Sequence, residues 1–234
     1  MPACFDPKFG VLPPAQLETW EALRPAARLG FALYDGTAIA LHLGHRQSVD
    51  FDFFSAGPLD KQAIRAAMPF IADATPIQDE PETLVVSASV PSGEVKVAFF
   101  GSIGFGRVNP PLQSRDGAML VASLDDLMTT KLKAILDRAE AKDYLDIAAM
   151  LSAGADLPKA LSAFKAMFRA EPRTALMALG YYEDGDLPSI PRRVREVLIG
   201  ARDRVRDLPE VRLTAGSLVV EIGPCEESGR TVTG

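Results

Sequence analysis

The hydrophobic pattern of this chain changes after residues 109–111. Of all the features of the sequence, this change most strongly restricts the folds that the chain can adopt. Before it, short apolar runs alternate with turn residues, which is typical of strands and short helices packed together. From Ser123 onward, nearly every segment repeats its apolar residues with the 3.6-residue period of a helix. The sequence therefore predicts an α+β domain over residues 1–122 and a helical domain over residues 123–234.

The first domain is expected to mix strands with helices. Two apolar runs, 83–90 and 94–100, are joined by Pro91–Ser92–Gly93, which indicates a β-hairpin. Other strands are predicted at 31–34, 48–54 and 118–122, and helices at 16–29, 37–43 and 59–68.

The second domain is expected to be a helical bundle. Its first helix has a clear start, because Ser123 is a good N-cap and Asp125 and Asp126 follow where the helix dipole favours acids. The predicted helices cover residues 124–138, 142–153, 157–169, 173–180 and 192–206. No role is assigned to residues 208–234, beyond a strand expected at 217–222.

The composition, 47% hydrophobic and 24% charged, is that of a soluble globular protein. No stretch approaches the roughly 18 apolar residues of a membrane helix, and the N-terminus lacks the pattern of a secretory signal. Cys4 and Cys225 do not have the spacing of zinc ligands. We therefore expect a cytoplasmic protein that does not bind membranes. The net charge of −6 argues against general adhesion to nucleic acid, although not against a local basic groove.

Two carboxylates, Asp50 and Asp52, stand at alternate positions of the predicted strand 48–54. Alternate side chains share a face, so these two would lie about 7 Å apart at their Cα atoms, with Val49, Phe51 and Phe53 pointing into the core. Such carboxylates repel unless a cation lies between them, and Mg²⁺ commonly binds one or two protein carboxylates together with substrate phosphates. A solvated outer strand face is the alternative.

Gly36 and Thr37 stand just upstream, at a predicted strand-to-helix turn. Backbone N–H groups at a helix start bind anions, and glycine lets a phosphate approach closely. A phosphate cradle beside a two-carboxylate metal site suits phosphoryl or nucleotidyl transfer. An ordinary turn is the alternative. Arg46 could face either a phosphate or solvent, and His42 and His45 are expected in surface or supporting positions.

Lys131 falls within the apolar stripe of the predicted helix 124–138. A lysine there is costly unless its ammonium is paired or emerges into a cleft, and a snorkelling lysine is the alternative. Asp143 and Asp146 share a face of the next helix. They could serve the same cleft, or Asp143 could match the helix dipole while Asp146 pairs with Lys142.

Three ordered segments resemble a known family: G-T-A-I-A-L-H-L-G-H-R-x-S-V-D-F-D-F-F, V-K-V-x-F-F-G and K-L-K-A-I-L-D-R-x-x-x-K-D-Y-x-D-I. The chain resembles the AbiEii/AbiGii-type nucleotidyltransferase toxins over roughly residues 30–150. This resemblance implies a mixed sheet with helices, similar to DNA polymerase β-like nucleotidyltransferases, followed by a C-terminal helical bundle.

The resemblance also assigns roles to individual residues. It implies that Gly36 and Thr37 hold a triphosphate and that Ser48 occupies the S-x-D position of the family. Asp50 and Asp52 would bind Mg²⁺. The later residues, which would contact the nucleotide or assist transfer, are Lys131, Asp143 and Asp146.

Two positions depart from the family pattern. The family usually has Gly–Gly before Thr, where this chain has Asp35–Gly36, and an acid beside a phosphate cradle is unhelpful unless its side chain turns away. Polymerase β-like enzymes also carry a third carboxylate on a neighbouring strand, which helps to deprotonate the attacking hydroxyl. The matching positions on strand 94–100 hold Lys96 and Ala98. The absence of this carboxylate implies either another base, for which Asp143 and Asp146 are the candidates, or an enzyme with impaired activity.

The main functional hypothesis is a Mg²⁺-dependent nucleotidyltransferase toxin that moves a nucleoside monophosphate from an NTP to an acceptor hydroxyl, with Lys131 neutralising charge on the triphosphate. By resemblance, the acceptor could be a tRNA 3′ end, and a cognate antitoxin could restrain the activity. Two alternatives stay open: a degenerate, non-catalytic nucleotide-binding module, and a phosphotransferase acting on a protein hydroxyl. An RNA acceptor would need concentrated basic groups. The best candidate is the predicted helix 192–206, where Arg192 and Arg195 share a face, and a solvated helix is the alternative.

Overall fold

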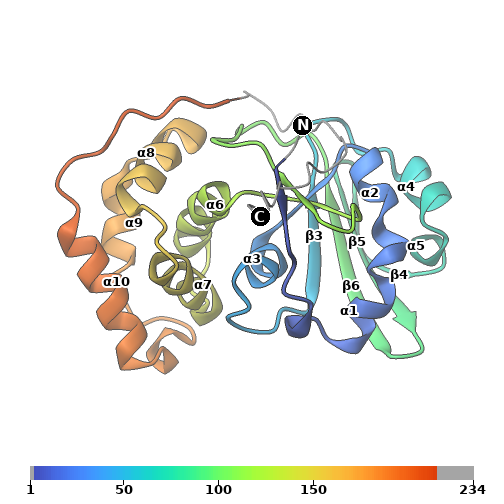
Figure 1. Cartoon of the computed structure of the whole chain (residues 1–234), viewed down its shortest axis with the longest axis horizontal. Coiled ribbons are helices and arrows are strands. Elements are labelled where there is room, and N and C mark those ends of the chain that lie inside the picture. The colour runs from blue at the N-terminus through green and yellow to red at the C-terminus, as the bar shows by residue number, and fades with distance from the viewer. Residues whose placement is uncertain (1–2, 215–234) are drawn as a thin grey trace, which may run out of the picture.

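The computed structural model describes residues 3–214 and contains a mixed sheet of eight strands (Figure 1). The order across the sheet is β1-β7-β8-β2-β3-β6-β5-β4. The strands are β1 (Cys4–Phe5), β2 (Ala32–Tyr34), β3 (Asp50–Phe54), β4 (Thr75–Glu80), β5 (Thr83–Val90), β6 (Gly93–Phe100), β7 (Leu112–Ser114) and β8 (Leu120–Val121). The central strand β3 runs antiparallel to β2 and parallel to β6. The predicted α+β class with a mixed sheet is therefore confirmed.

Helices cover both faces of this sheet. Their bounds are α1 (Pro14–Thr19), α2 (Pro25–Arg28), α3 (Asp35–Leu43), α4 (Lys61–Ala67), α5 (Pro69–Ala72), α6 (Leu124–Asp137), α7 (Ala141–Ser152), α8 (Leu157–Phe168), α9 (Pro172–Ala178) and α10 (Arg192–Arg204). In Figure 1, α1, α2, α4 and α5 lie on one side of the sheet and α3 lies on the other. Helices α6 and α7 pack against α3, and α8, α9 and α10 form the outer layer beyond them. Helix α3 is thus enclosed between the sheet and the helical half.

The centre of the core is aromatic. The rings of Phe53 and Phe99 stack at 5.2 Å between centroids, and Phe51 lies 6.2 Å from Phe53. All three are essentially buried, and burying each such ring contributes roughly 1.5–3 kcal/mol. The alternation predicted for this strand therefore holds for the two phenylalanines. It fails for Val49, which is 61% exposed because the strand begins one residue later.

The helical half agrees with the predicted pattern within two residues at every boundary. Ser123 is the N-cap of α6, and its hydroxyl oxygen accepts the backbone N–H of Asp126 at 3.2 Å. The prediction of one helix over 16–29 is wrong: α1 ends at Thr19, a 3₁₀ turn follows, and Pro25 starts a separate short helix. The structure also contains β4, which the sequence analysis did not predict.

The last described residues return toward the sheet. Val211 and Leu213 pack against a small cluster that includes Val108 and Met167, and the backbone N–H of Thr214 donates to Arg107 at 2.9 Å. The strand predicted at 217–222 lies outside the described residues. Within residues 3–214, none of the helices has the length and hydrophobicity needed to cross a membrane.

Candidate functional site

A small cavity, which we call the charged pocket, opens where the N-terminus of α3 meets the start of β3. It is lined by six residues predicted from the sequence, namely Gly36, Arg46, Ser48, Asp50, Asp52 and Lys131. Asp35 and Lys142 also line it. The structure therefore brings together residues from both halves of the chain.

The two carboxylates of the D-x-D motif share one face of β3 and both line the charged pocket. Burial, together with the negative charges of Asp35 and Asp50, raises the pKa of Asp52 to about 7. A cation between Asp50 and Asp52 would relieve this repulsion. Their oxygen donors are the kind that Mg²⁺ prefers, so the pair fits the predicted metal role.

The strand pairing settles which residues stand opposite this motif. In the register of β3 with β6, Asp50 is paired with Lys96 and Asp52 with Ala98. The Nζ of Lys96 lies 3.5 Å from Asp50 Oδ2. The two positions at which a third carboxylate was sought therefore hold an amine and a methyl group.

The N-terminus of α3 forms the wall beside the D-x-D motif. Since the helix begins at Asp35, the backbone N–H groups of its first turn have no partner within the helix. A Cβ on Gly36 would lie 2.6 Å from Arg46 Nη2 and 2.9 Å from Ser48 Oγ, so glycine keeps this wall close to both side chains. Thr37 is fully buried and its hydroxyl donates to the backbone carbonyl of Asp50. Its side chain therefore fastens α3 to β3, which leaves its backbone N–H for any phosphate contact.

Lys131 is 2% exposed and its ammonium is surrounded by carboxylates. It pairs with Asp35, with Asp143 Oδ1 at 2.6 Å and with Asp146 Oδ2 at 3.0 Å. Burial alone would lower the pKa of Lys131, but these three charges outweigh it and raise the pKa. The sequence left two interpretations of Lys131, a paired ammonium at a cleft and a snorkelling lysine. The structure agrees with the first.

Asp146 has further partners at the beginning of the loop that follows α3. Arg46 binds it through two nitrogens, Nε at 2.6 Å and Nη2 at 2.7 Å, and His45 Nε2 lies 2.7 Å from Oδ1. Burial alone would raise the pKa of Asp146, but the hydrogen bonds from His45 and Arg46 and the charge of Lys131 lower it well below its usual range. Lys142 instead pairs with Glu140 at 2.8 Å, so the Lys142–Asp146 pair weighed from sequence is replaced by this network.

Asp143 is the third acid around Lys131, and it is fully buried at the start of α7. Arg138 donates to it from Nε at 2.7 Å and from Nη2 at 3.0 Å, and the same guanidinium lies 3.4 Å from Asp35. Burial alone would raise the pKa of Asp143, but Arg138 and Lys131 lower it. Asp143 is therefore ionised at neutral pH and already committed to two cations.

The carboxylates of Asp35, Asp143 and Asp146 come close enough to hold a metal ion, with one oxygen from each within 4.8 Å of the others. The ammonium of Lys131 contacts all three, so it already supplies the positive charge at that point. A metal ion is better matched to the neighbouring Asp50 and Asp52, where no such buried amine is interposed.

Sequence reasoning missed three residues of this site. It treated Asp35 only as a departure from the family pattern, considered Lys142 only as a salt-bridge partner of Asp146, and assigned no role to Arg138. Asp35 adopts a left-handed backbone (φ +57°) and turns its carboxylate toward Lys131 and Arg138. One sequence signal could have identified them. Arg138 is followed closely by the segment K-D-x-x-D at 142–146, so several charged side chains gather at the start of one helix.

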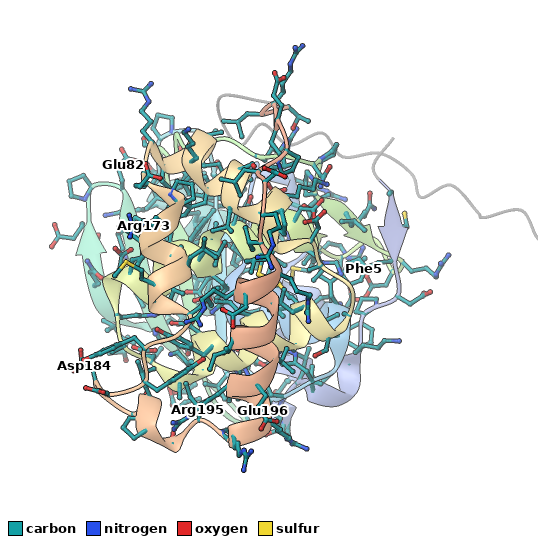
Figure 2. The ribbon with its side chains drawn as sticks, turned by 90° about the vertical axis from the view of Figure 1, so that its left-hand side faces the viewer. Phe5, Glu82, Arg173, Asp184, Arg195 and Glu196 are labelled. Atoms are coloured by element: carbon teal, nitrogen blue, oxygen red, sulfur yellow. The ribbon has the colours of Figure 1, made fainter. Side chains whose placement is uncertain are left out.

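Helix α10 carries the arginines predicted to form a basic wall. Figure 2 shows Arg195 and Glu196 at one end of this helix. Arg195 donates to the carbonyls of Ile190 at 2.9 Å and Pro188 at 2.6 Å, and its guanidinium lies 4.9 Å from the ring centroid of Tyr182. These contacts hold the guanidinium of Arg195 against its own chain, whereas the sequence analysis expected it to be available for RNA.

Another arginine of α10 lies closer to the site. Arg193 is exposed and lines a groove together with His45 and Arg46, the residues that hold Asp146. Because Arg46 also lines the charged pocket, this groove adjoins the candidate site.

Comparison with known proteins finds a family, a protein of similar sequence and a solved structure of similar fold. The sequence model of the family described as nucleotidyl transferase AbiEii toxin, type IV toxin–antitoxin system, matches residues 21–213. An uncharacterized protein of Aquifex aeolicus is 28% identical over 175 residues, which covers 71% of this chain and 82% of that protein. Among solved structures, MenT4, a nucleotidyltransferase toxin of Mycobacterium tuberculosis, is similar in fold, with a TM-score of 0.53 and 13% identity. The similarity covers 82% of this chain and 83% of MenT4.

Proposed function

The chain belongs to the AbiEii nucleotidyltransferase toxin family, and we propose that it transfers a nucleoside monophosphate from an NTP to an acceptor hydroxyl in the charged pocket. The observation that carries the proposal is the meeting of three features in one cavity. These are the D-x-D carboxylates, the N–H groups at the start of α3 that have no partner within the helix, and the buried cation Lys131.

Each feature has a role in this proposal. Asp50 and Asp52 would hold Mg²⁺, which when bound neutralises charge on the phosphates and orients them for attack. The first turn of α3, opened by Gly36, would hold the phosphate oxygens through backbone N–H groups. Ser48 and the exposed ammonium of Lys142 face the same cavity and would contact the outer phosphates.

The buried network gives Lys131 a positioning and electrostatic role. Three acids, Asp35, Asp143 and Asp146, are balanced by three cations, Lys131, Arg46 and Arg138. Asp143 and Asp146 have lowered pKa values and hold cations, so they are weak proton acceptors. We therefore assign them to orienting Lys131 and Arg46 toward the phosphates rather than to deprotonating the acceptor.

For the acceptor we propose an RNA 3′ end, and tRNA is the first RNA class to test. The groove lined by Arg46 and Arg193 adjoins the charged pocket, and the exposed Arg193 would contribute positive charge toward a phosphate backbone. We also propose that a cognate antitoxin restrains the activity, as expected for a family of type IV toxin–antitoxin systems.

The decisive experiment is transfer of label from α-³²P-NTPs, each of the four in turn, to total RNA and to purified tRNA in the presence of Mg²⁺. Asp50→Ala and Asp52→Ala should each abolish labelling while the fold is retained. The matched control is Asp73→Ala, which removes an exposed aspartate at the end of α5, on the other side of the sheet. Loss of labelling in Asp73→Ala as well, or full labelling in both D-x-D variants, would contradict the assignment.

A second candidate function, a nucleotide-binding module without turnover, is favoured by Lys96 and Ala98 at the third-carboxylate positions. It predicts saturable binding of Mg-NTP with no labelled product on RNA or protein. The remaining alternative is phosphotransfer to a protein hydroxyl. Mass spectrometry of cellular proteins incubated with this protein and NTP tests it, because phosphotransfer adds a phosphate whereas nucleotidyl transfer adds a nucleotide.

A further inference from the structure

Beside the charged pocket lies a second cavity with a different lining, which we call the aromatic pocket. Its volume is about 250 Å³, and its aromatic residues are Tyr34, Phe54, Phe105 and Phe168. They come from β2, β3, the segment after β6 and the end of α8, and the side of α6 closes the cavity. Sequence reasoning gave none of these four rings a function.

The rings are arranged around one another in two orientations. Tyr34 and Phe54 stack at 4.8 Å with 15° between their planes. Phe105 presents itself edge-on to both, at 6.4 Å from Tyr34 and 6.3 Å from Phe54. Phe54, Phe105 and Phe168 are only partly buried, so their apolar surface is available inside the cavity. Such a set of rings fits a flat aromatic ligand better than an aliphatic one.

The two pockets adjoin at Asp35, which lines both of them. Phe54 stands two residues beyond Asp52 on the same face of β3, at a Cα separation of about 7 Å. Tyr34 is paired with Asp52 across the strands. The distance between a group bound by the D-x-D carboxylates and a flat ring stacked on Phe54 would therefore be roughly the length of one ribose.

We propose that the aromatic pocket holds the nucleobase of the nucleotide whose phosphates lie in the charged pocket. This inference rests on the proposed function and adds a base subsite to it. The rings contribute stacking, which is available to every base because each has a π-face. Lys133 and Asp137 line the same cavity and pair with each other. The remaining N–H groups of the ammonium and the second carboxylate oxygen would offer a donor and an acceptor to the edge of the base.

The test compares two ligands that differ only by the nucleoside. Binding of Mg²⁺ with each α,β-methylene NTP, which cannot be transferred, is measured by calorimetry against binding of Mg²⁺ with tripolyphosphate. The full chain should bind the nucleotides more tightly. Phe105→Ala and Phe168→Ala should each lower affinity for the nucleotides by about 5- to 150-fold, the loss typical of removing one stacking ring. Both should change affinity for tripolyphosphate by less than about twofold.

Phe70→Ala is the matched control, because Phe70 is a partly buried ring on α5, on the other side of the sheet. It should leave both affinities unchanged. If the full chain binds tripolyphosphate as tightly as the nucleotides, or if the two ring variants weaken both ligands equally, the base subsite is wrong while the proposed function stands. If the full chain binds neither ligand, the base subsite and the proposed function fail together. The comparison of ligands in the unaltered chain needs no variant, so it decides the matter even if a variant does not fold.

Discussion

Asp52 is a site at which the structure predicts that removing a charge stabilises the protein. Its pKa is raised to about 7 by burial and by the charges of Asp35 and Asp50, whereas an unfolded aspartate titrates near 3.8. Below about pH 4 the group is protonated in both states. Between about pH 4 and pH 7 the folded state keeps a proton that the unfolded state releases, so the stability of the wild type falls as the pH rises through this window.

The size of the effect follows from the same pKa difference. A difference of roughly three units corresponds to a ceiling of about 4 kcal/mol above pH 7. Solvent reaches the carboxylate through the charged pocket, which reduces the penalty, and we expect about 1–2 kcal/mol. Asp52→Asn keeps the shape of the side chain and removes the charge. At pH 8 it should therefore raise the melting temperature by about 2–8 °C.

The assay is thermal unfolding of the wild type and Asp52→Asn from pH 4 to pH 8 with a chelator present. The stabilisation should be small near pH 4 and grow until about pH 7. Asp73→Asn, an exposed change, should shift stability by less than about 0.5 kcal/mol at every pH. Adding Mg-NTP should stabilise the wild type and not Asp52→Asn. A variant less stable than the wild type at pH 8 would refute this reasoning, because it would mean that a partner in the folded protein stabilises the ionised carboxylate.

Two further predictions concern the cations around the site. Lys131→Met should destabilise the fold by about 3–5 kcal/mol, because it leaves buried carboxylates without their shared partner. Lys133 on the same helix is only partly buried and pairs with Asp137, so Lys133→Met should cost less than about 1 kcal/mol. Denaturant titration of both variants measures the difference, and equal losses would contradict the burial argument. Arg193→Glu should weaken RNA binding and flatten its dependence on salt while leaving NTP binding unchanged, and Arg192→Glu should do so less. Equal salt slopes for the wild type and Arg193→Glu would show that the groove does not hold RNA.

The fold could be predicted well where local pattern determines structure. The hairpin of β5 and β6 and the helices after Ser123 follow from alternation, helical period and capping, which depend on neighbours in the sequence. Strand β4 was not predicted because all of its residues are exposed, so it has no buried face that would produce alternating apolar residues. The helical period of residues 16–29 does not reveal the break before Pro25, although a proline at this position favours a new helix start.

For the site, residue types were easier to predict than partners. The position of Lys131 within an apolar stripe indicated a paired or cleft-facing ammonium, and the structure pairs it. Its partner Asp35 lies almost a hundred residues away, and the contact depends on how α3 packs against α6. The same holds for Arg46 and Asp146, which come together only because the loop after α3 reaches α7. Such long-range ion pairs leave no periodic trace in the sequence.

The position of Asp35 leads to the last prediction. Its left-handed backbone is one that glycine adopts freely and that aspartate tolerates, so Asp35→Gly should fit without moving α3. The change removes one carboxylate from Lys131 and Arg138 and one negative charge from beside Asp52. Relief of backbone strain and loss of an ion pair oppose each other, so stability should change by less than about 1 kcal/mol.

Binding should change more than stability. With one acid fewer beside the phosphate wall, Asp35→Gly should bind Mg-NTP more tightly, by about 5- to 10-fold if one screened charge interaction of about 1 kcal/mol is relieved. Asp35→Asn separates charge from backbone, because asparagine also tolerates the left-handed region and carries no charge. It should show most of the same gain when the dissociation constant is measured by calorimetry. Weaker binding in both variants would overturn this account, because it would make Asp35 a contributor to cation binding together with Asp143 and Asp146 rather than a competitor of the phosphates.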